Sequence, residues 1–140
     1  MIAILGGSGF VGKNVVEVLK EGGKAFVTTS LSEGVDLRNL DACINFFEKT
    51  QPDYIINCAA HVGSLNYVTE QAANVILDNS RMILSMYEAI AKVCPNAIVI
   101  NPIANCAYPA TAIDPAQGGN NGALRKFTDV SEEFHEAINS

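Results

Sequence analysis

The 140-residue sequence lacks the features that would assign it to a membrane or nucleic-acid-binding class. No apolar run approaches the roughly 18 residues needed to cross a bilayer, and no basic segment followed by an apolar core marks an export signal. Basic residues are few and scattered, 9 against 15 acidic ones, and the net charge of −6 argues against a nucleic-acid partner. We therefore expect a cytoplasmic protein with no nucleic-acid and no membrane partner.

Cysteine is also scarce, and no spacing typical of a metal site is present. The four cysteines, Cys43, Cys58, Cys94 and Cys106, are far apart and form no C-x-x-C pair. This pattern indicates buried thiols in a reducing compartment. Near the end of the chain, Glu132, Glu133 and His135 lack further ligands in a metal-binding pattern, so a solvated helix face is the expected interpretation. No metal is predicted.

Short apolar segments of two kinds alternate along the chain. Apolar residues make up 49% and charged residues 17%, which is a globular composition. Continuous apolar runs of strand length alternate with segments of helical period, and this alternation is typical of parallel βαβ units. We predict an α/β fold with a doubly wound, Rossmann-like parallel sheet of about five strands in the order 3-2-1-4-5, with helices on both faces. The expected strands are 2–5, 25–29, 34–37, 54–60 and 97–101, and the expected helices are 10–21, 40–50 and 72–93.

The composition changes in the last quarter of the chain. Segment 115–122 is rich in Gly and Asn and begins with a Pro, and the apolar stripe of 127–138 is thin. We therefore expect residues 1–112 to form the main domain and residues 113–140 to form a loop and a short helical tail.

Three glycines follow the first predicted strand at an even spacing of three. Gly6 allows a sharp turn, Gly9 allows a ligand to approach the backbone, and Gly12 allows close contact between helix and sheet. The N-terminus of the next helix favours an anion through its unpaired N–H groups and its dipole. The pattern predicts a site for a dinucleotide pyrophosphate; the alternative is a simple strand-to-helix turn.

Segment 6–12, GGSGFVG, resembles the cofactor motif of the extended short-chain dehydrogenases/reductases, the NAD-dependent epimerase/dehydratase family. Segment 35–37 resembles the part that touches the adenine, and 58–60 the small-residue strand end near the nicotinamide. Segments 59–64, 78–80 and 106–109 are most similar to the GDP-fucose synthase branch, and the resemblance covers about 1–112. It implies cofactor contacts from Gly6, Ser8, Gly9, Phe10, Val11, Gly12, Thr29, Asp36, Leu37, Cys58, Ala59, Ala60 and Asn79.

The choice of cofactor depends on the end of the second strand. An acidic residue there would bind the ribose 2′-hydroxyl and repel a 2′-phosphate. The sequence has Thr28, Thr29 and Ser30 at this place, with no acid and no arginine. NADP is therefore the favoured cofactor, with NAD as the alternative.

The resemblance implies catalysis by a Tyr-x-x-x-Lys pair and a Ser, and the sequence lacks both. Four residues after the tyrosines at 54, 67, 87 and 108 stand Cys, Gln, Ala and Ala, and Ala104 occupies the serine position. The catalytic residues are therefore unknown, with Cys106 and His61 as weak candidates against a buried cysteine and a loop histidine. We expect the chain to be the dinucleotide-binding part of an NAD(P)-dependent nucleotide-sugar epimerase or reductase, and an oligomer is possible. The alternatives are a non-catalytic nucleotide-binding module and a degenerate fragment.

Overall fold

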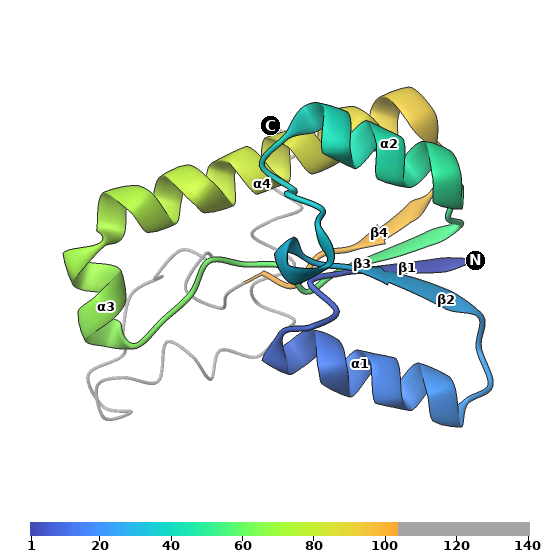
Figure 1. Ribbon diagram of the computed structural model, residues 1–140, viewed down its shortest axis with the longest axis horizontal. Helices are drawn as coiled ribbons and strands as arrows, with labels where there is room; N and C mark the ends of the chain where they lie inside the picture. Colours follow the sequence, from blue (N-terminus) through green and yellow to red (C-terminus); the bar gives the residue numbers. More distant parts are fainter. Residues whose placement is uncertain (104–140) are drawn as a thin grey trace, which may run out of the picture. The chain divides into compact units, whose positions relative to one another are not determined.

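Residues 1–103 are described in the computed structural model, and they form a parallel sheet with helices on both faces (Figure 1). The strands are β1 (Ile2–Leu5), β2 (Phe26–Thr29), β3 (Tyr54–Asn57) and β4 (Ile98–Ile100). The helices are α1 (Phe10–Glu21), α2 (Leu40–Thr50), α3 (Leu65–Glu70) and α4 (Ala72–Val93), with a short 3₁₀ helix, η1, at Leu31–Glu33.

The strand order is β2-β1-β3-β4, and every neighbouring pair is parallel. At the carboxyl edge Leu5 lies opposite Thr29 on one side and Asn57 on the other. Every connection between paired strands is therefore a crossover that places its helix over a face of the sheet. The doubly wound parallel architecture is confirmed, as is the predicted relative order of these four strands.

The prediction of a strand at 34–37 is wrong, and the described residues contain four strands rather than five. Gly34 adopts the left-handed conformation with φ +87°, and the Val35 N–H donates to the Ser30 carbonyl instead of to a neighbouring strand. Leu37 is buried in the core cluster nevertheless. The segment is therefore an irregular loop whose apolar residues pack into the core. Its composition alone does not distinguish it from a short strand.

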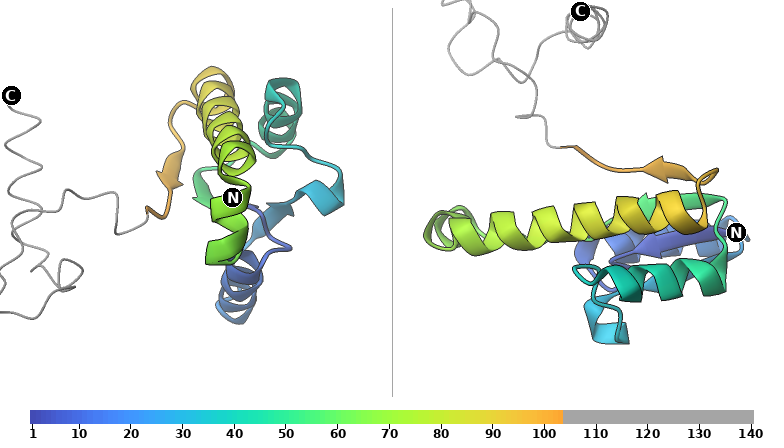
Figure 2. Two further views of the ribbon diagram at one scale, coloured as in Figure 1. Left: turned by 90° about the vertical axis from the view of Figure 1, so that its left-hand side faces the viewer. Right: turned by 90° about the horizontal axis from the view of Figure 1, so that it is seen from above.

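The core lies between the sheet and two helices on one of its faces. Helices α2 and α4 lie side by side over that face, and α1 lies on the opposite face (Figures 1 and 2). Ala3 and Ile55 from the sheet, Phe47 from α2 and Met86 from α4 belong to one cluster of buried side chains. Cys43, which is also buried there, is a thiol whose pKa rises to about 11 because it is removed from water and lies near Asp36.

Strand β4 is less buried than its apolar sequence predicts. Val99 packs against the core, whereas Ile98 and Ile100 are 55% and 51% exposed among the described residues. Successive side chains of a strand point to opposite faces, and α2 and α4 cover only one of them. On α1, Val11 and Val18 are exposed as well.

Two helix starts show why local sequence forms these elements. Asn39 accepts a hydrogen bond from the Ala42 N–H and caps α2, and Ser64 accepts one from the Tyr67 N–H and caps α3. Helix α3 was not predicted, because six residues give too short an apolar period to detect.

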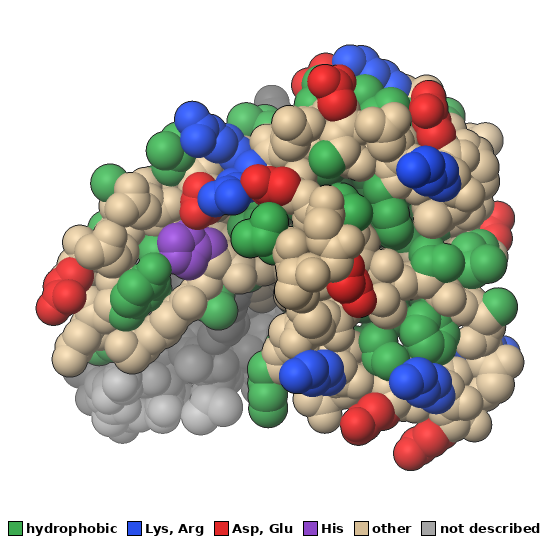
Figure 3. Space-filling model, in the orientation of Figure 1, with side chains coloured by type: hydrophobic (Ala, Val, Ile, Leu, Met, Phe, Trp, Pro, Cys, Tyr) green, Lys and Arg blue, Asp and Glu red, His purple; other side chains and the backbone are tan. Residues whose placement is uncertain are grey.

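Three further features of the described residues are the charges on the surface, the apolar character of the helices and the potential metal ligands. Basic side chains are interspersed with acidic ones on the face shown in Figure 3. No helix within residues 1–103 is long and apolar enough to cross a membrane, and that part of the chain contains no cluster of three potential metal ligands.

Candidate functional site

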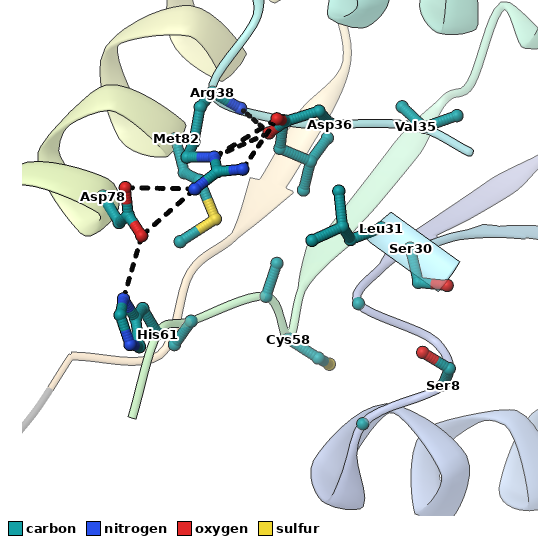
Figure 4. A pocket seen from close by; sticks show the side chains of 15 residues that line it. Ser8, Ser30, Leu31, Val35, Asp36, Arg38, Cys58, His61, Asp78 and Met82 are labelled. Carbon is teal, nitrogen blue, oxygen red and sulfur yellow. Dashed lines mark hydrogen bonds and ion pairs between the residues drawn. The ribbon is translucent and has the colours of Figure 1, made fainter. Parts of the chain in front are cut away.

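A cleft of about 420 Å³ opens where β1, β2 and β3 end (Figure 4). In doubly wound sheets, ligands bind at the carboxyl ends of the strands, and this volume lies in the range of small-molecule sites. The described residues that line it are Gly6, Ser8, Gly9, Ser30, Leu31, Val35, Asp36, Leu37, Arg38, Cys58, Ala59, Ala60, His61, Asp78 and Met82.

Gly6 and Gly12 are required by the backbone at the floor of the cleft. Gly6 has φ +76°, and a Cβ added to it would lie 2.7 Å from the Ala59 Cα. Its N–H donates to the Thr29 carbonyl oxygen at 2.7 Å, which ties the turn to the end of β2. A Cβ on Gly12 would collide with the Gly6 carbonyl oxygen. Only glycine therefore lets α1 start so close to the end of β1.

Gly9 differs, because its surroundings are less crowded. It occupies the N-cap position of α1 with φ −75°, and an added Cβ would meet only the Gly6 carbonyl oxygen, at 3.3 Å. No side chain caps this helix, and its first turn contains no acidic residue. The N–H groups of the first turn, with the positive end of the helix dipole, can therefore take an anion from the cleft.

The opposite wall is held by an arginine between two carboxylates. Arg38 contacts Asp36 at 2.8 Å and Asp78 at 3.2 Å, so it joins the loop before α2 to helix α4. The hydrogen bond from Arg38 lowers the pKa of Asp36. Burial opposes ionisation of Asp78, but hydrogen bonds from Arg38 and His61 outweigh it and lower its pKa. Both carboxylates are thus ionised at neutral pH, and both are already paired with Arg38.

His61 is fixed from three directions at the end of β3. Its Nδ1 lies 3.0 Å from the Asp78 Oδ2, and its Nε2 lies 2.8 Å from the Tyr67 hydroxyl. Asn79 accepts a hydrogen bond from the His61 N–H and donates one to the His61 carbonyl, each at 2.8 Å. The loop after β3 is therefore anchored to α4 by two adjacent residues, Asp78 and Asn79.

The structure brings most of the predicted site residues together. Gly6, Ser8, Gly9, Asp36, Leu37, Cys58, Ala59 and Ala60 line the cleft, and so does the candidate His61. Of the other predicted residues, Phe10, Val11 and Gly12 form the first turn of α1, Thr29 is buried behind the glycine loop, and Asn79 uses its amide on backbone groups. Their contact with a cofactor stays a prediction. Cys106 lies outside the described residues.

Six lining residues are not among the predicted contacts: Ser30, Leu31, Val35, Arg38, Asp78 and Met82. Of these, Val35 stands in the segment 35–37 that the resemblance assigns to the adenine. The Asp36-x-Arg38 spacing was the available signal, because an Asp side chain in a loop often accepts a hydrogen bond from the backbone N–H two residues on, as Asp36 does here from Arg38. Nothing local indicates that Asp78, which is 40 residues from Arg38, completes the pair. The lining thiol of Cys58 has a raised pKa because it is partly buried, so it stays protonated and neutral at neutral pH.

Several known proteins with GDP-sugars in their names are similar to this chain. It is 26% identical over 114 residues to the GDP-L-fucose synthase of Azorhizobium caulinodans, covering 81% of this chain and 36% of that one. It is 37% identical over 78 residues to a GDP-6-deoxy-D-talose 4-dehydrogenase of Aggregatibacter actinomycetemcomitans, covering 54% of this chain and 26% of that one. A GDP-L-fucose synthetase structure from Naegleria fowleri bound to NADP matches with a TM-score of 0.63 and 29% identity, over 81% of this chain and 34% of that one.

These matches cover a minor part of the relatives. The chain spans 36% and 26% of the two curated relatives and 34% of the solved structure, so it corresponds to about a third of their length. A sequence model of the NAD dependent epimerase/dehydratase family matches residues 2–126. Since this match covers most of the chain, the protein belongs to the NAD-dependent epimerase/dehydratase family.

Proposed function

We propose that this chain binds a nicotinamide dinucleotide as the cofactor-binding part of a nucleotide-sugar epimerase or reductase. The observation that carries the proposal is the N-terminus of α1 at Gly9, which has no capping side chain and opens into the cleft at the carboxyl edge of the sheet. An anionic pyrophosphate matches those N–H groups in charge and in hydrogen bonding.

The two ends of the cleft suit the two ends of a dinucleotide. The loop at Asp36 and Leu37 would contact the adenine, and the small side chains of Ala59 and Ala60 leave room for the nicotinamide ring. When bound, the cofactor supplies the hydride chemistry, and the residues of this chain orient it. Both NADP and NAD fit this arrangement, and the NADP bound to the Naegleria fowleri enzyme supports NADP.

The test is calorimetric titration of the 140-residue chain with NADPH and NADH. Gly9→Val places a branched side chain where the pyrophosphate must approach, and we expect binding of both cofactors to be lost while the unfolding midpoint is retained. Gly22→Val is the matched control, because Gly22 has the same φ of −75° and its added Cβ would also lie 3.3 Å from a carbonyl oxygen, at the far end of α1. No heat with either cofactor for the unaltered chain would reject the proposal.

The second candidate function is a nucleotide-binding module without catalysis. It is favoured by the absence of any Tyr-x-x-x-Lys pair in the 140 residues. Both candidates bind the cofactor, and both predict no turnover of a nucleotide sugar by these 140 residues alone. We also propose a cytoplasmic location, which the unpaired thiols of Cys43, Cys58 and Cys94 support.

A further inference from the structure

The structure brings a carboxylate to the end of β2, where residues 28–30 contain none. Helix η1 turns the chain back, and the Glu33 N–H donates to the Ser30 carbonyl oxygen at 3.0 Å. The two carboxylate oxygens then accept hydrogen bonds from two hydroxyls at the strand end. The Thr28 hydroxyl donates to Oε1 at 3.3 Å, and the Ser30 hydroxyl donates to Oε2 at 3.0 Å.

A chain of hydroxyls joins this carboxylate to the glycine loop. The Ser30 and Ser32 hydroxyls lie 2.9 Å apart, and the Ser32 and Ser8 hydroxyls lie 3.2 Å apart. Ser8 and Ser30 both line the cleft, and their hydroxyls lie on the same side of it in Figure 4. The charge of Glu33 is therefore separated from the cleft wall by a single hydroxyl, that of Ser30.

Within residues 1–103, this end of the cleft has no cation to balance that charge. Among the described lining residues the only lysine or arginine is Arg38, which lies across the cleft from Ser8 and is paired with Asp36 and Asp78 (Figure 4). A dianionic group placed beside Ser8 and Ser30 would meet hydroxyls and the negative charge of Glu33. A ribose hydroxyl at the same place would meet hydrogen-bond acceptors.

We propose that Glu33 determines how this chain discriminates between NAD and NADP. The inference rests on the proposed function, in which the adenosine ribose lies beside the end of β2. Glu33 acts on the ribose 2′ position through Ser30. It favours a 2′-hydroxyl, which can join the hydroxyl network, and it disfavours a 2′-phosphate by charge repulsion. On this inference the chain prefers NAD, against the preference for NADP expected from residues 28–30 alone and unlike the similar Naegleria fowleri enzyme, which was solved with NADP bound. Glu33, five residues beyond Thr28, thus discriminates at the ribose 2′ position. In other dinucleotide-binding folds an acidic residue at the end of the strand itself has this role.

The experiment measures the ratio of the Kd for NADP to the Kd for NAD by titration of the 140-residue chain. Glu33→Gln keeps one of the two acceptor oxygens and removes the charge, and we expect the ratio to fall by about tenfold, the equivalent of about 1.4 kcal/mol. Glu33→Lys reverses the charge and should lower the ratio further. Glu21→Gln is the matched control, since it removes one exposed charge at the other end of α1 and should leave the ratio unchanged.

Three outcomes separate this inference from the proposed function. A ratio that falls in both Glu33 variants and holds in the control supports the inference. Binding of both cofactors with the same ratio in all four proteins would overturn it and leave the proposed function intact. Absence of binding by the unaltered chain, with a normal unfolding transition, would overturn both.

Discussion

The three motif glycines have two different roles, although they look alike in the sequence. Gly6 has no room for a Cβ because the backbone of Ala59 occupies the space, and Gly12 has none because the backbone of Gly6 does. Gly9 lines the cleft, and an added Cβ there would meet only the Gly6 carbonyl oxygen, at 3.3 Å. The fold therefore requires glycine at two of the positions, and the proposed ligand requires it at the third.

Substitution of each glycine by alanine, which adds one methyl group, measures this difference in packing. Gly12→Ala forces the first turn of α1 away from the Gly6 carbonyl, and we expect it to destabilise the protein by about 1–3 kcal/mol, the usual cost of overpacking. The measurement is the urea midpoint, with Gly9→Ala as the comparison that should unfold close to the unaltered chain. Equal midpoints for the two variants would contradict the packing that we describe at Gly12.

Acid sensitivity should come in part from the carboxylates that Arg38 joins. The pKa values of Asp36 and Asp78 are lowered in the folded state, so their contribution to stability is present above their ordinary pKa of about 3.9 and is lost as the pH falls through the lowered values. Asp78→Asn removes one of these groups. We expect a lower unfolding midpoint at neutral pH and a smaller loss of stability on acidification, with Asp36 still contributing.

The control for this change is Glu70→Gln, which neutralises an exposed carboxylate on α3. Denaturant unfolding at neutral pH and at a pH of about 3 gives both quantities. The same acid dependence in Asp78→Asn and in the unaltered chain would show that the contacts of Asp78 with Arg38 and His61 do not contribute to stability.

At the scale of elements, α2 depends on its cap as well as on its buried face. Asn39 holds the Ala42 N–H at 3.0 Å, and the buried Phe47 lies two turns further on. Asn39→Ala leaves an N–H at the start of the helix without its partner, and we expect a loss of about 1 kcal/mol in the free energy of unfolding. Asn39→Asp keeps an acceptor and should retain the stability, so similar losses in both variants would argue against a capping role.

Regular elements were predictable from the sequence, and irregular ones were not. Helix α4 occupies the predicted span 72–93, and α1 the predicted span 10–21, because long segments repeat their apolar residues with a helical period. The segment at 34–37 has strand composition, but the turn at Gly34 and the hydrogen bond from the Val35 N–H to the Ser30 carbonyl decide its conformation. The position of Glu33 beside Thr28 depends on a single 3₁₀ turn, which no periodicity indicates.

The candidate site shows the same division. The glycine loop and the small residues after β3 are local patterns, so the sequence predicted their place at the edge of the sheet. Arg38 and Asp78 meet only because α4 crosses back over the sheet. Pairs of this kind follow from the topology, and one sequence without its fold does not show them.

At the scale of the whole molecule, cofactor binding and turnover should separate. The 140 residues contain no Tyr-x-x-x-Lys pair, and general acid–base catalysis commonly contributes about 10²–10⁴ in rate. We expect the chain to bind NADPH or NADH and to turn over no nucleotide sugar. The assay is loss of reduced-nicotinamide absorbance with a 4-keto-6-deoxy nucleotide sugar, and turnover would direct mutagenesis to Cys106 and His61.

The order of strands in the sheet has a consequence for the synthesis of the protein. Strand β1 is translated first, yet it lies between β2 and β3, and its residue Ile2 is opposite Tyr54, 52 residues later in the chain. At about 5–20 residues per second, the ribosome completes this partner roughly 3–10 s after β1. During that interval Ala3, Ile4 and Leu5, which are 0% exposed in the fold, have no complete place in which to pack. The nascent segment is therefore open to chaperones until β3 has left the exit tunnel.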